Sequence, residues 1–284
     1  MADSRAAPSR DADSAGCGPD PAELLTVARL AAQAGADTAR AWRERADELR
    51  IEEKHGPADL VSQADREAES AVRAVLARCR PQDAVLGEEH GETGGQSGVR
   101  WIVDPIDGTT SYLYGRADWA VSVAAADTAR DRLLAAVVAE PMLGRLTQAR
   151  LGGGTWSGGM RCRIRTGDEL ARALVEVNLG TPRQQERAGQ MVAALLPRVR
   201  DLRRSGSAAA ALAMVATGRA DAAWIPGVRP WDCAAGVLLV QEAGGLVGDL
   251  AEVIPGTWPP GGDVLAAGPG LREPLRHTLA AVYR

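Results

Sequence analysis

The sequence predicts an α+β half followed by an α/β half. Up to about residue 155, helical patterns come first and strand-like runs follow them, whereas from about residue 170 the two kinds of segment alternate. No internal repeat and no long linker separates the halves. We expect a disordered leader over 1–20, an N-terminal half over 21–155 and a C-terminal half over 156–284, with the seam at Gly152–Gly159.

In the first half, apolar residues at helical spacing after Pro21 predict a helix over 22–50. A loop or hairpin follows at 54–65, and a second helix is expected over 63–79 with Ser62 as its N-cap. Strands are predicted at 84–86, 99–104, 119–127 and 132–140, and a further hairpin at 144–159. The stretch between the first two strands, residues 87–98, is polar and rich in glycine, which predicts a loop.

In the second half, the alternation predicts strands at 173–179, 220–225, 245–249 and 263–268. The intervening helices are expected over 184–197, 206–217 and 231–243, and a closing helix over 270–282. The helix over 206–217 consists almost entirely of small residues.

Composition and charge exclude several classes of protein. A net charge of -4 gives no general attraction to nucleic acid or to an anionic membrane. No apolar run reaches the roughly 18 residues that a membrane span needs, and the N-terminus lacks the apolar centre of a signal peptide. The four cysteines are scattered and predict reduced thiols. We therefore expect a cytoplasmic protein.

Acidic residues stand where apolar strands end or helices begin. Asp104 and Asp107 close one strand, Glu88 and Glu89 follow another, and Asp232 opens a small-residue helix. A carboxylate at such a point is costly if it is buried without a partner, but not if it binds a divalent cation. Mg²⁺ prefers oxygen ligands, and the shortage of histidine argues against zinc or iron. The acids therefore predict a Mg²⁺ site.

The turn that follows Asp107 suits a phosphate. Gly108 lets the backbone approach a ligand closely, and the Thr109 hydroxyl can orient a water molecule. Metal ions a few ångströms apart can activate that water and stabilise the leaving oxygen of a phosphate ester. The chemistry that this arrangement indicates is metal-assisted hydrolysis of a phosphomonoester.

In these motifs the chain resembles the inositol monophosphatase family of Mg²⁺-dependent, lithium-sensitive phosphatases. The segments "GEE" at 87–89, "DPIDGTT" at 104–110 and "WDCAAG" at 231–236 stand in the order and at the separations usual in that family. The segments "ADLVSQAD" and "RRSGSAAAALAMVATGRADAA" also match, so the likeness covers roughly residues 22–282. It implies the layered α-β-α-β-α sandwich of inositol and sugar phosphatases, and a homodimer.

The resemblance also implies roles for individual residues. It assigns a first Mg²⁺ to Glu88, Asp104 and the Ile106 carbonyl, a second to Asp104, Asp107 and Asp232, and a weaker third to Glu88, so that two to three ions bind. Thr109 paired with Asp65 would orient or deprotonate the attacking water. The Gly108 and Thr109 amides would hold phosphate oxygens, and Lys54, the only lysine of the chain, would lie near the phosphate.

The chain departs from the family pattern at two positions. Ser111 replaces the asparagine that usually follows "DGTT". Ile225 stands six residues before Trp231, where inositol-specific members carry a glutamate that contacts sugar hydroxyls. An apolar side chain cannot accept those hydrogen bonds, so another substrate is expected. Trp224 and Arg229, which flank this position, could supply stacking or a second anion contact.

Each of these residues also has a structural interpretation. Asp104 and Asp107 could form a solvated turn, and Asp65 could be a first-turn acid that the helix dipole favours. Lys54 could be an exposed loop cation. Thr109 and Ser207 could cap helices, Ala208 could pack in the core, and Arg229 could be a surface residue.

We predict a Mg²⁺-dependent phosphatase that acts on a small phosphorylated polyol, sugar or nucleoside, with Ser207, Ala208, Trp224, Ile225 and Arg229 as substrate-binding candidates. The alternatives within the family are phosphatases of 3'-phosphoadenosine 5'-phosphate, fructose 1,6-bisphosphate or histidinol phosphate, and a phosphatase of secondary metabolism. The alternative of another class is a non-catalytic member that binds proteins, as some bacterial relatives do with the transcription apparatus. The complete acidic set favours the enzyme.

Overall fold

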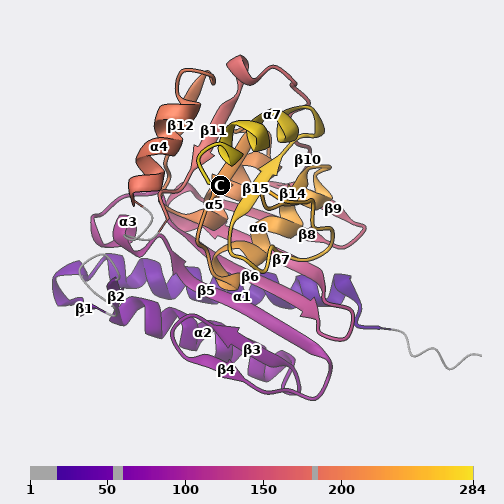
Figure 1. Ribbon diagram of the computed structural model, residues 1–284. Coiled ribbons are helices and arrows are strands. Elements are labelled where there is room, and N and C mark those ends of the chain that lie inside the picture. The colour runs from indigo at the N-terminus through magenta and orange to yellow at the C-terminus, as the bar shows by residue number, and fades with distance from the viewer. Residues whose placement is uncertain (1–17, 54–59, 181–184, 284) are drawn as a thin grey trace, which may run out of the picture.

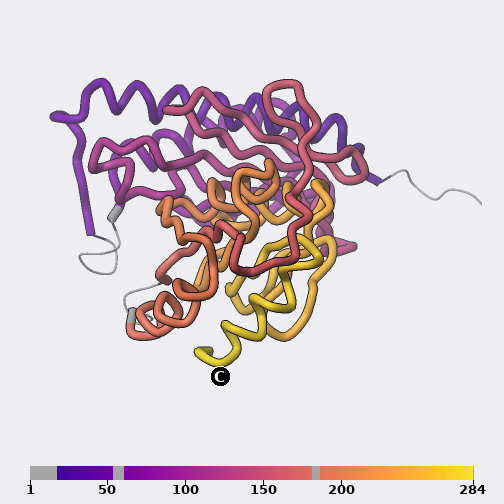
Figure 2. Tube along the Cα trace, turned by 90° about the horizontal axis from the view of Figure 1, so that it is seen from above, coloured from indigo at the N-terminus to yellow at the C-terminus, as the bar shows by residue number. Residues whose placement is uncertain are grey.

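The chain folds into five layers, helices and sheets alternating in the order α-β-α-β-α. The computed structural model describes residues 18–53, 60–180 and 185–283. Figure 1 labels the elements, and Figure 2, seen from above, shows the N-terminal helices at one side of the stack and the C-terminal helix at the other. This arrangement confirms the layered sandwich that the family resemblance implied.

The larger sheet has eight strands in the order β10-β9-β8-β7-β6-β5-β3-β4. Neighbouring strands are antiparallel, except that β3 and β5 are parallel. The strands are β3 (Ala84–Gly87), β4 (Gly91–Thr93), β5 (Val99–Asp107), β6 (Ala120–Asp127), β7 (Arg132–Glu140), β8 (Arg145–Arg150), β9 (Gly154–Ser157) and β10 (Met160–Cys162). A separate hairpin consists of β1 (Ile51–Glu53) and β2 (Leu60–Ser62).

The smaller sheet has five strands in the order β12-β11-β13-β15-β14. Strand β11 runs parallel to both of its neighbours, while β15 is antiparallel to both of its own. The strands are β11 (Leu174–Val177), β12 (Asp201–Arg203), β13 (Ala222–Ile225), β14 (Leu246–Gly248) and β15 (Val264–Ala267).

Helices cover both faces of each sheet. The outer face of the larger sheet carries α1 (Pro21–Arg43) and α2 (Gln63–Cys79), and the outer face of the smaller sheet carries α4 (Gln185–Leu195) and α7 (Pro269–Ala280). Between the sheets lie α5 (Ala208–Ala216) and α6 (Pro230–Glu242). The short elements are α3 (Thr109–Leu113) and three 3₁₀-helices, η1 (Ala46–Glu48), η2 (Pro141–Leu143) and η3 (Leu170–Arg172).

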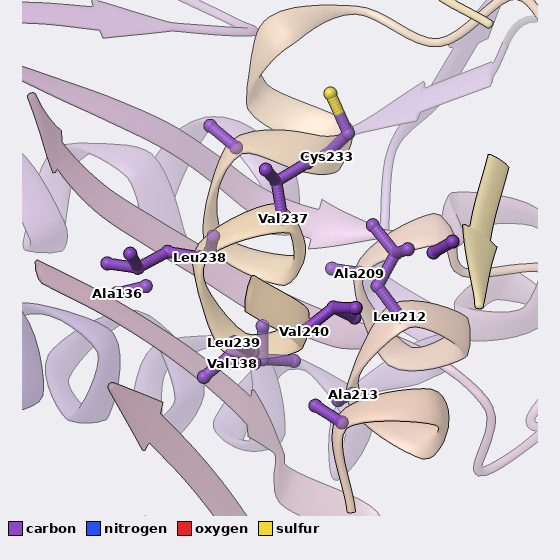
Figure 3. Close-up of a cluster of buried hydrophobic side chains, with 14 of the residues drawn as sticks. Ala136, Val138, Ala209, Leu212, Ala213, Cys233, Val237, Leu238, Leu239 and Val240 are labelled. Carbon is purple, nitrogen blue, oxygen red and sulfur yellow. The ribbon is translucent and has the colours of Figure 1, made fainter. Parts of the chain in front are cut away.

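Small residues allow the central layer to pack tightly. Figure 3 shows Leu238 and Leu239 of α6 directed toward β7, with Val240 on the side of α5. A Cβ atom added to Gly236 of α6 would lie only 2.4 Å from the Cβ atom of Leu212 in α5. The two helices therefore approach as closely as a glycine permits, and this contact positions their N-termini.

The structure refines several element predictions. The first helix ends at Arg43 and not near residue 50, and the segment after it forms η1 and β1. The polar loop after β3 contains β4, which pairs with β3. Sequence patterns missed β10 and β12 because each is a three-residue edge strand without a full period of alternation.

Two further predictions concern the chain as a whole. The larger sheet includes β10 and so continues past residue 155, and the division into halves at that residue stays a prediction. Residues 1–17, most of the predicted leader, lie outside the described residues. Across the described part of the chain, no helix combines the length and the apolar character that crossing a bilayer requires.

Candidate metal and substrate site

Three carboxylates from separate segments meet near the C-terminal ends of β3 and β5 in the larger sheet. Glu88 follows β3, Asp104 lies within β5, and Asp232 lies in the first turn of α6. One oxygen atom of each lies within 4.8 Å of those of the other two. Because α6 belongs to the C-terminal part of the chain, the cluster forms only when α6 has packed against the larger sheet.

Strand β5 carries its acids through an irregularity. It continues to Asp107 and does not end at Asp104 as predicted, and its pairing with β6 shifts between these two residues. The Asp104 Oδ1 atom accepts a hydrogen bond of 3.1 Å from the Ile106 amide. In a regular strand, Asp104 and Asp107 would lie on opposite faces, because they are three residues apart. The irregularity between them lets both acids face the same region.

The cluster is electrostatically strained without a cation. Burial raises the pKa of Asp104 well above its usual value, and the charges of Glu88, Asp107 and Asp232 raise it further. Burial and the charge of Asp107 likewise raise the pKa of Asp232 to about 8. An all-oxygen donor set whose charges repel one another suits a hard divalent cation such as Mg²⁺, so these residues fit the predicted metal.

Asp107 is held at the N-terminus of α5. Its Oδ2 atom accepts hydrogen bonds from the Ser207 hydroxyl at 2.7 Å and from the Ala209 amide at 2.6 Å. Burial raises the pKa of Asp107 to about 6, and these donors oppose the rise. Ser207 also caps α5, because its Oγ atom accepts from the Ala210 amide at 3.0 Å. The Ser207 hydroxyl thus links Asp107 to the start of α5, and its predicted substrate contact stays a prediction.

Thr109 and Asp65 lie together although 44 residues separate them. The Thr109 hydroxyl donates to the Asp65 Oδ1 atom at 3.3 Å and lies 3.2 Å from the Ile106 carbonyl oxygen. Asp65 also accepts from the Ser62 amide at 2.8 Å and from the Ser62 hydroxyl at 2.5 Å. These bonds hold the buried carboxylate of α2 against the turn that contains Gly108.

Gly108 has a φ of 95°. A side chain is strained in this conformation, and a Cβ atom would lie 3.2 Å from the Asp118 carbonyl oxygen. Glycine is therefore required at this turn.

Glu69 is a residue that sequence analysis missed. It is fully buried in α2 and accepts from the Glu89 amide at 2.7 Å and from the His90 amide at 3.2 Å. Arg73 pairs with it at 2.6 Å. Glu69 thus holds the turn that contains Glu88, and its place on the apolar face of α2 was the available signal.

A polar cavity of about 530 Å³ opens beside the acid cluster. Its lining includes the predicted residues Glu88, Gly108 and Thr109, and Ser111, where the chain departs from the family pattern. The other lining residues were not candidates from the sequence, namely Thr110, Tyr114, Arg116, Asp118, Arg204, Ser205 and Gly206. Arg116 pairs with Asp118 at 2.9 Å. A second cavity of about 520 Å³, beside residues 164–169, contains none of the clustered acids. The first cavity is therefore the candidate substrate site.

The remaining predicted substrate residues lie elsewhere. Trp224 and Ile225 have no exposed surface, because β13 is covered on both faces, and Ala208 is 2% exposed. Trp224 packs edge-on against Tyr283 with ring centroids 5.1 Å apart. These three side chains are buried and do not line the cavity, and their predicted substrate contacts stay predictions.

Two further candidates remain. Arg229 is exposed but does not line the cavity; its backbone amide donates to Asp232 at 2.7 Å. Lys54 lies outside the described residues.

Comparison with known proteins gives a consistent result. The family model described as the inositol monophosphatase family matches residues 20–282. An inositol-1-monophosphatase of Rhizobium meliloti is 42% identical over 195 residues, which is 67% of this chain and 72% of that protein. The Nus factor SuhB of Pseudomonas aeruginosa is 36% identical, and the match covers 80% of this chain and 85% of that protein.

A solved structure supports the same relationship. The crystal structure of the extragenic suppressor protein suhB from Bartonella henselae superposes with a TM-score of 0.83 at 32% identity. The match covers 90% of this chain and 98% of that one. The layered architecture is thus shared along nearly the whole length of both proteins.

Proposed function

The chain belongs to the inositol monophosphatase family and is a phosphomonoesterase of that type, and we propose that it hydrolyses a small phosphorylated polyol, sugar or nucleoside with the aid of Mg²⁺. The observation that carries this proposal is the meeting of Glu88, Asp104 and Asp232 beside a polar cavity. A cation that binds between these carboxylates would offset their repulsion and the cost of their burial.

The residues present would hold two to three Mg²⁺ ions. We assign Glu88, Asp104 and the Ile106 carbonyl to one ion and Asp104, Asp107 and Asp232 to another, with Glu88 also serving a third. When bound, Mg²⁺ supplies Lewis-acid stabilisation of the phosphate charge and lowers the pKa of water. The two hydrogen bonds with printed geometry from the start of α5, from the Ser207 hydroxyl and the Ala209 amide, both go to Oδ2 of Asp107, so metal binding would use its Oδ1 atom.

The Thr109–Asp65 pair would serve the attacking water. A hydroxyl that donates to Asp65 keeps its lone pairs for the water, so the pair can orient it and accept its proton. The Gly108 and Thr109 amides would hold phosphate oxygens, and Lys54 would lie nearby. The alcohol part of the ester would occupy the cavity that Arg116, Arg204 and Ser205 line.

Phosphate release in the presence of Mg²⁺ tests the function. The panel comprises inositol 1-phosphate, fructose 1,6-bisphosphate, histidinol phosphate, nucleoside monophosphates and 3'-phosphoadenosine 5'-phosphate. We expect Mg²⁺-dependent turnover of at least one compound and a clear preference among them. Silence on the whole panel, with Mg²⁺ binding intact, would refute the proposed substrate class.

A second candidate function rests on the relative that is named a Nus factor. A protein-binding role would need a partner from the transcription machinery, and retention of RNA polymerase on the immobilised chain would support it. A homodimer and a cytoplasmic location stay predictions; sedimentation at several protein concentrations tests the former.

A further inference from the structure

Tyr114 is an aromatic residue that the fold leaves exposed at the candidate substrate cavity. It is 79% exposed, and it lines the same polar cavity as Glu88 and Thr109. Among the described residues, no second aromatic ring and no arginine packs against its ring. A single exposed aromatic side chain is ordinary on a protein surface, but one that lines a ligand cavity is free to stack on the ligand.

The backbone that carries Tyr114 is held in place. Its amide donates to the Thr110 carbonyl oxygen at 3.1 Å, at the end of α3. Tyr112 of the same helix is fully buried, and its hydroxyl donates to the Ala39 carbonyl oxygen at 2.8 Å. The Arg43 guanidinium donates to the Tyr112 carbonyl oxygen at 2.6 Å. The exposed ring therefore extends from an anchored backbone, which reduces the entropy lost when a ligand binds.

Arg204 supplies a positive charge to the same cavity. Its guanidinium makes no hydrogen bond or ion pair with any described residue, whereas the neighbouring Arg203 pairs with Asp201. The other arginine of the cavity, Arg116, pairs with Asp118 at 2.9 Å. The cavity thus contains one guanidinium group whose charge no ion pair offsets, and such a group suits an anionic part of a ligand.

The segments that carry Tyr114 and Arg204 pack against each other. A Cβ atom added to Gly206 would lie 3.0 Å from the Ser111 Oγ atom. One added to Gly108 would lie 3.5 Å from the Gly206 carbonyl oxygen. The chain after β12 therefore contacts the turn and the helix that follow Asp107. Because both side chains line one cavity of about 530 Å³, a size usual for small-molecule sites, a single ligand can contact both.

We propose that Tyr114 and Arg204 form the subsite for the alcohol part of the ester, and that they select an alcohol with a planar ring and a second anionic group. The ring stacks on Tyr114, and the anion pairs with Arg204. This inference rests on the proposed function and narrows its substrate class to esters such as a nucleoside with two separate phosphates. The sequence suggested Trp224 and Arg229 for these two contacts, but neither residue lines the cavity.

The test uses four kinds of phosphate ester with the full-length protein and Mg²⁺. Inositol 1-phosphate has neither feature, and adenosine 3'- and 5'-monophosphate have the planar base alone. Fructose 1,6-bisphosphate has the second anion alone, and 3'-phosphoadenosine 5'-phosphate has both. We expect the parent protein to have its highest kcat/KM with the compound that combines the two features.

The variants separate the two contacts. Tyr114→Ala should lower kcat/KM for the adenine esters about tenfold relative to inositol 1-phosphate, because the stacking surface is lost, and Tyr114→Phe should retain the parent ratio. Arg204→Gln should lower kcat/KM for the two bisphosphates about tenfold relative to the monophosphates. It should also weaken the salt dependence of kcat/KM for the bisphosphates, since a charge pair is screened by salt and stacking is not.

The matched control is Arg203→Gln, which removes an arginine that pairs with Asp201 and does not line the cavity. It should leave both preferences unchanged. Tyr114 and Arg204 are exposed, and neither side chain has a partner in the described part of the chain, so their variants should keep the parent melting temperature. Equal losses on all the esters, or preferences that survive both Tyr114→Ala and Arg204→Gln, would overturn the proposal.

The same data separate this inference from the proposed function. A parent protein that hydrolyses none of these esters would refute the proposed function, and this inference with it. A parent protein that prefers inositol 1-phosphate would support the proposed function but overturn the selection of a planar ring and a second anion.

Discussion

Replacing Gly236 with alanine should destabilise the protein and weaken its metal site. The new Cβ atom would lie 2.4 Å from the Leu212 Cβ atom and 2.5 Å from its Cδ1 atom. Carbon atoms in good contact are about 3.5–4.0 Å apart. Because a Cβ position is fixed by the backbone, no rotamer change of residue 236 relieves the clash, and α5 and α6 must separate by about 1 Å.

The expected magnitude follows from two opposing effects. Overpacking costs about 1–3 kcal/mol, and a contact between two Cβ atoms that cannot move without their backbones should fall in the upper part of that range, at about 2–3 kcal/mol. Alanine is favoured over glycine within a helix by about 1 kcal/mol. A net loss of about 1–2 kcal/mol would lower the melting temperature by roughly 2–6 °C in a protein of this size. Since Asp107 is bonded to the start of α5 and Asp232 lies in the start of α6, the Mg²⁺ concentration for half-maximal activity should rise several-fold.

The assay combines thermal unfolding with a Mg²⁺ titration of phosphate release. The matched control is Gly189→Ala in α4, where a Cβ atom meets nothing within 4 Å, so stability should rise by about 0.5–1 kcal/mol. Adding Leu212→Ala should cost somewhat less in the Gly236→Ala background than alone, because it removes the contacts with the Leu212 Cδ1 and Cγ atoms, while the contact with the Cβ atom remains. A Gly236→Ala variant as stable as the parent, with the same Mg²⁺ requirement, would refute this account of the helix contact.

Further predictions concern the acid cluster and β13. Asp104→Asn should abolish turnover without lowering the melting temperature in EDTA, because it removes a buried like charge; retained activity would contradict the metal assignment. In the metal-free protein, Asp107 and Asp232 have pKa values raised to about 6 and about 8, so the folded chain binds more protons than the unfolded chain from about pH 4 upward. Stability in EDTA should therefore fall as the pH rises from about 5 to about 8, and Mg²⁺ should reduce the fall; a rise with pH would contradict the electrostatic argument. Ile225→Glu, which introduces the glutamate of inositol-specific members, should lower the melting temperature because this side chain is fully buried; a variant that is as stable as the parent and more active on inositol 1-phosphate would contradict this expectation. Millimolar Li⁺ should inhibit by displacing Mg²⁺, and phosphate release that is indifferent to Li⁺ would argue against that mode of metal binding.

The sequence by itself determined the acidic residues and most of the elements that carry them. Glu88, Asp104 and Asp232 were selected because each stands at a strand end or helix start, and all three meet in the structure. The approach of Thr109 to Asp65 was also expected, from the family resemblance. These features depend on local signals, such as periodicity, turns and motif spacing, which a linear sequence records.

Only the tertiary structure decided what surrounds the acids. Strand β13 is covered by helices on both faces, so Trp224 and Ile225 pack in cores and not in a cavity. Ser207 serves Asp107, Glu69 holds the turn after β3, and Arg204 and Ser205 line the cavity. Such contacts join segments that are far apart in the chain and depend on how five layers stack. Burial and pairing follow from that stacking, and no local pattern of residues specifies it.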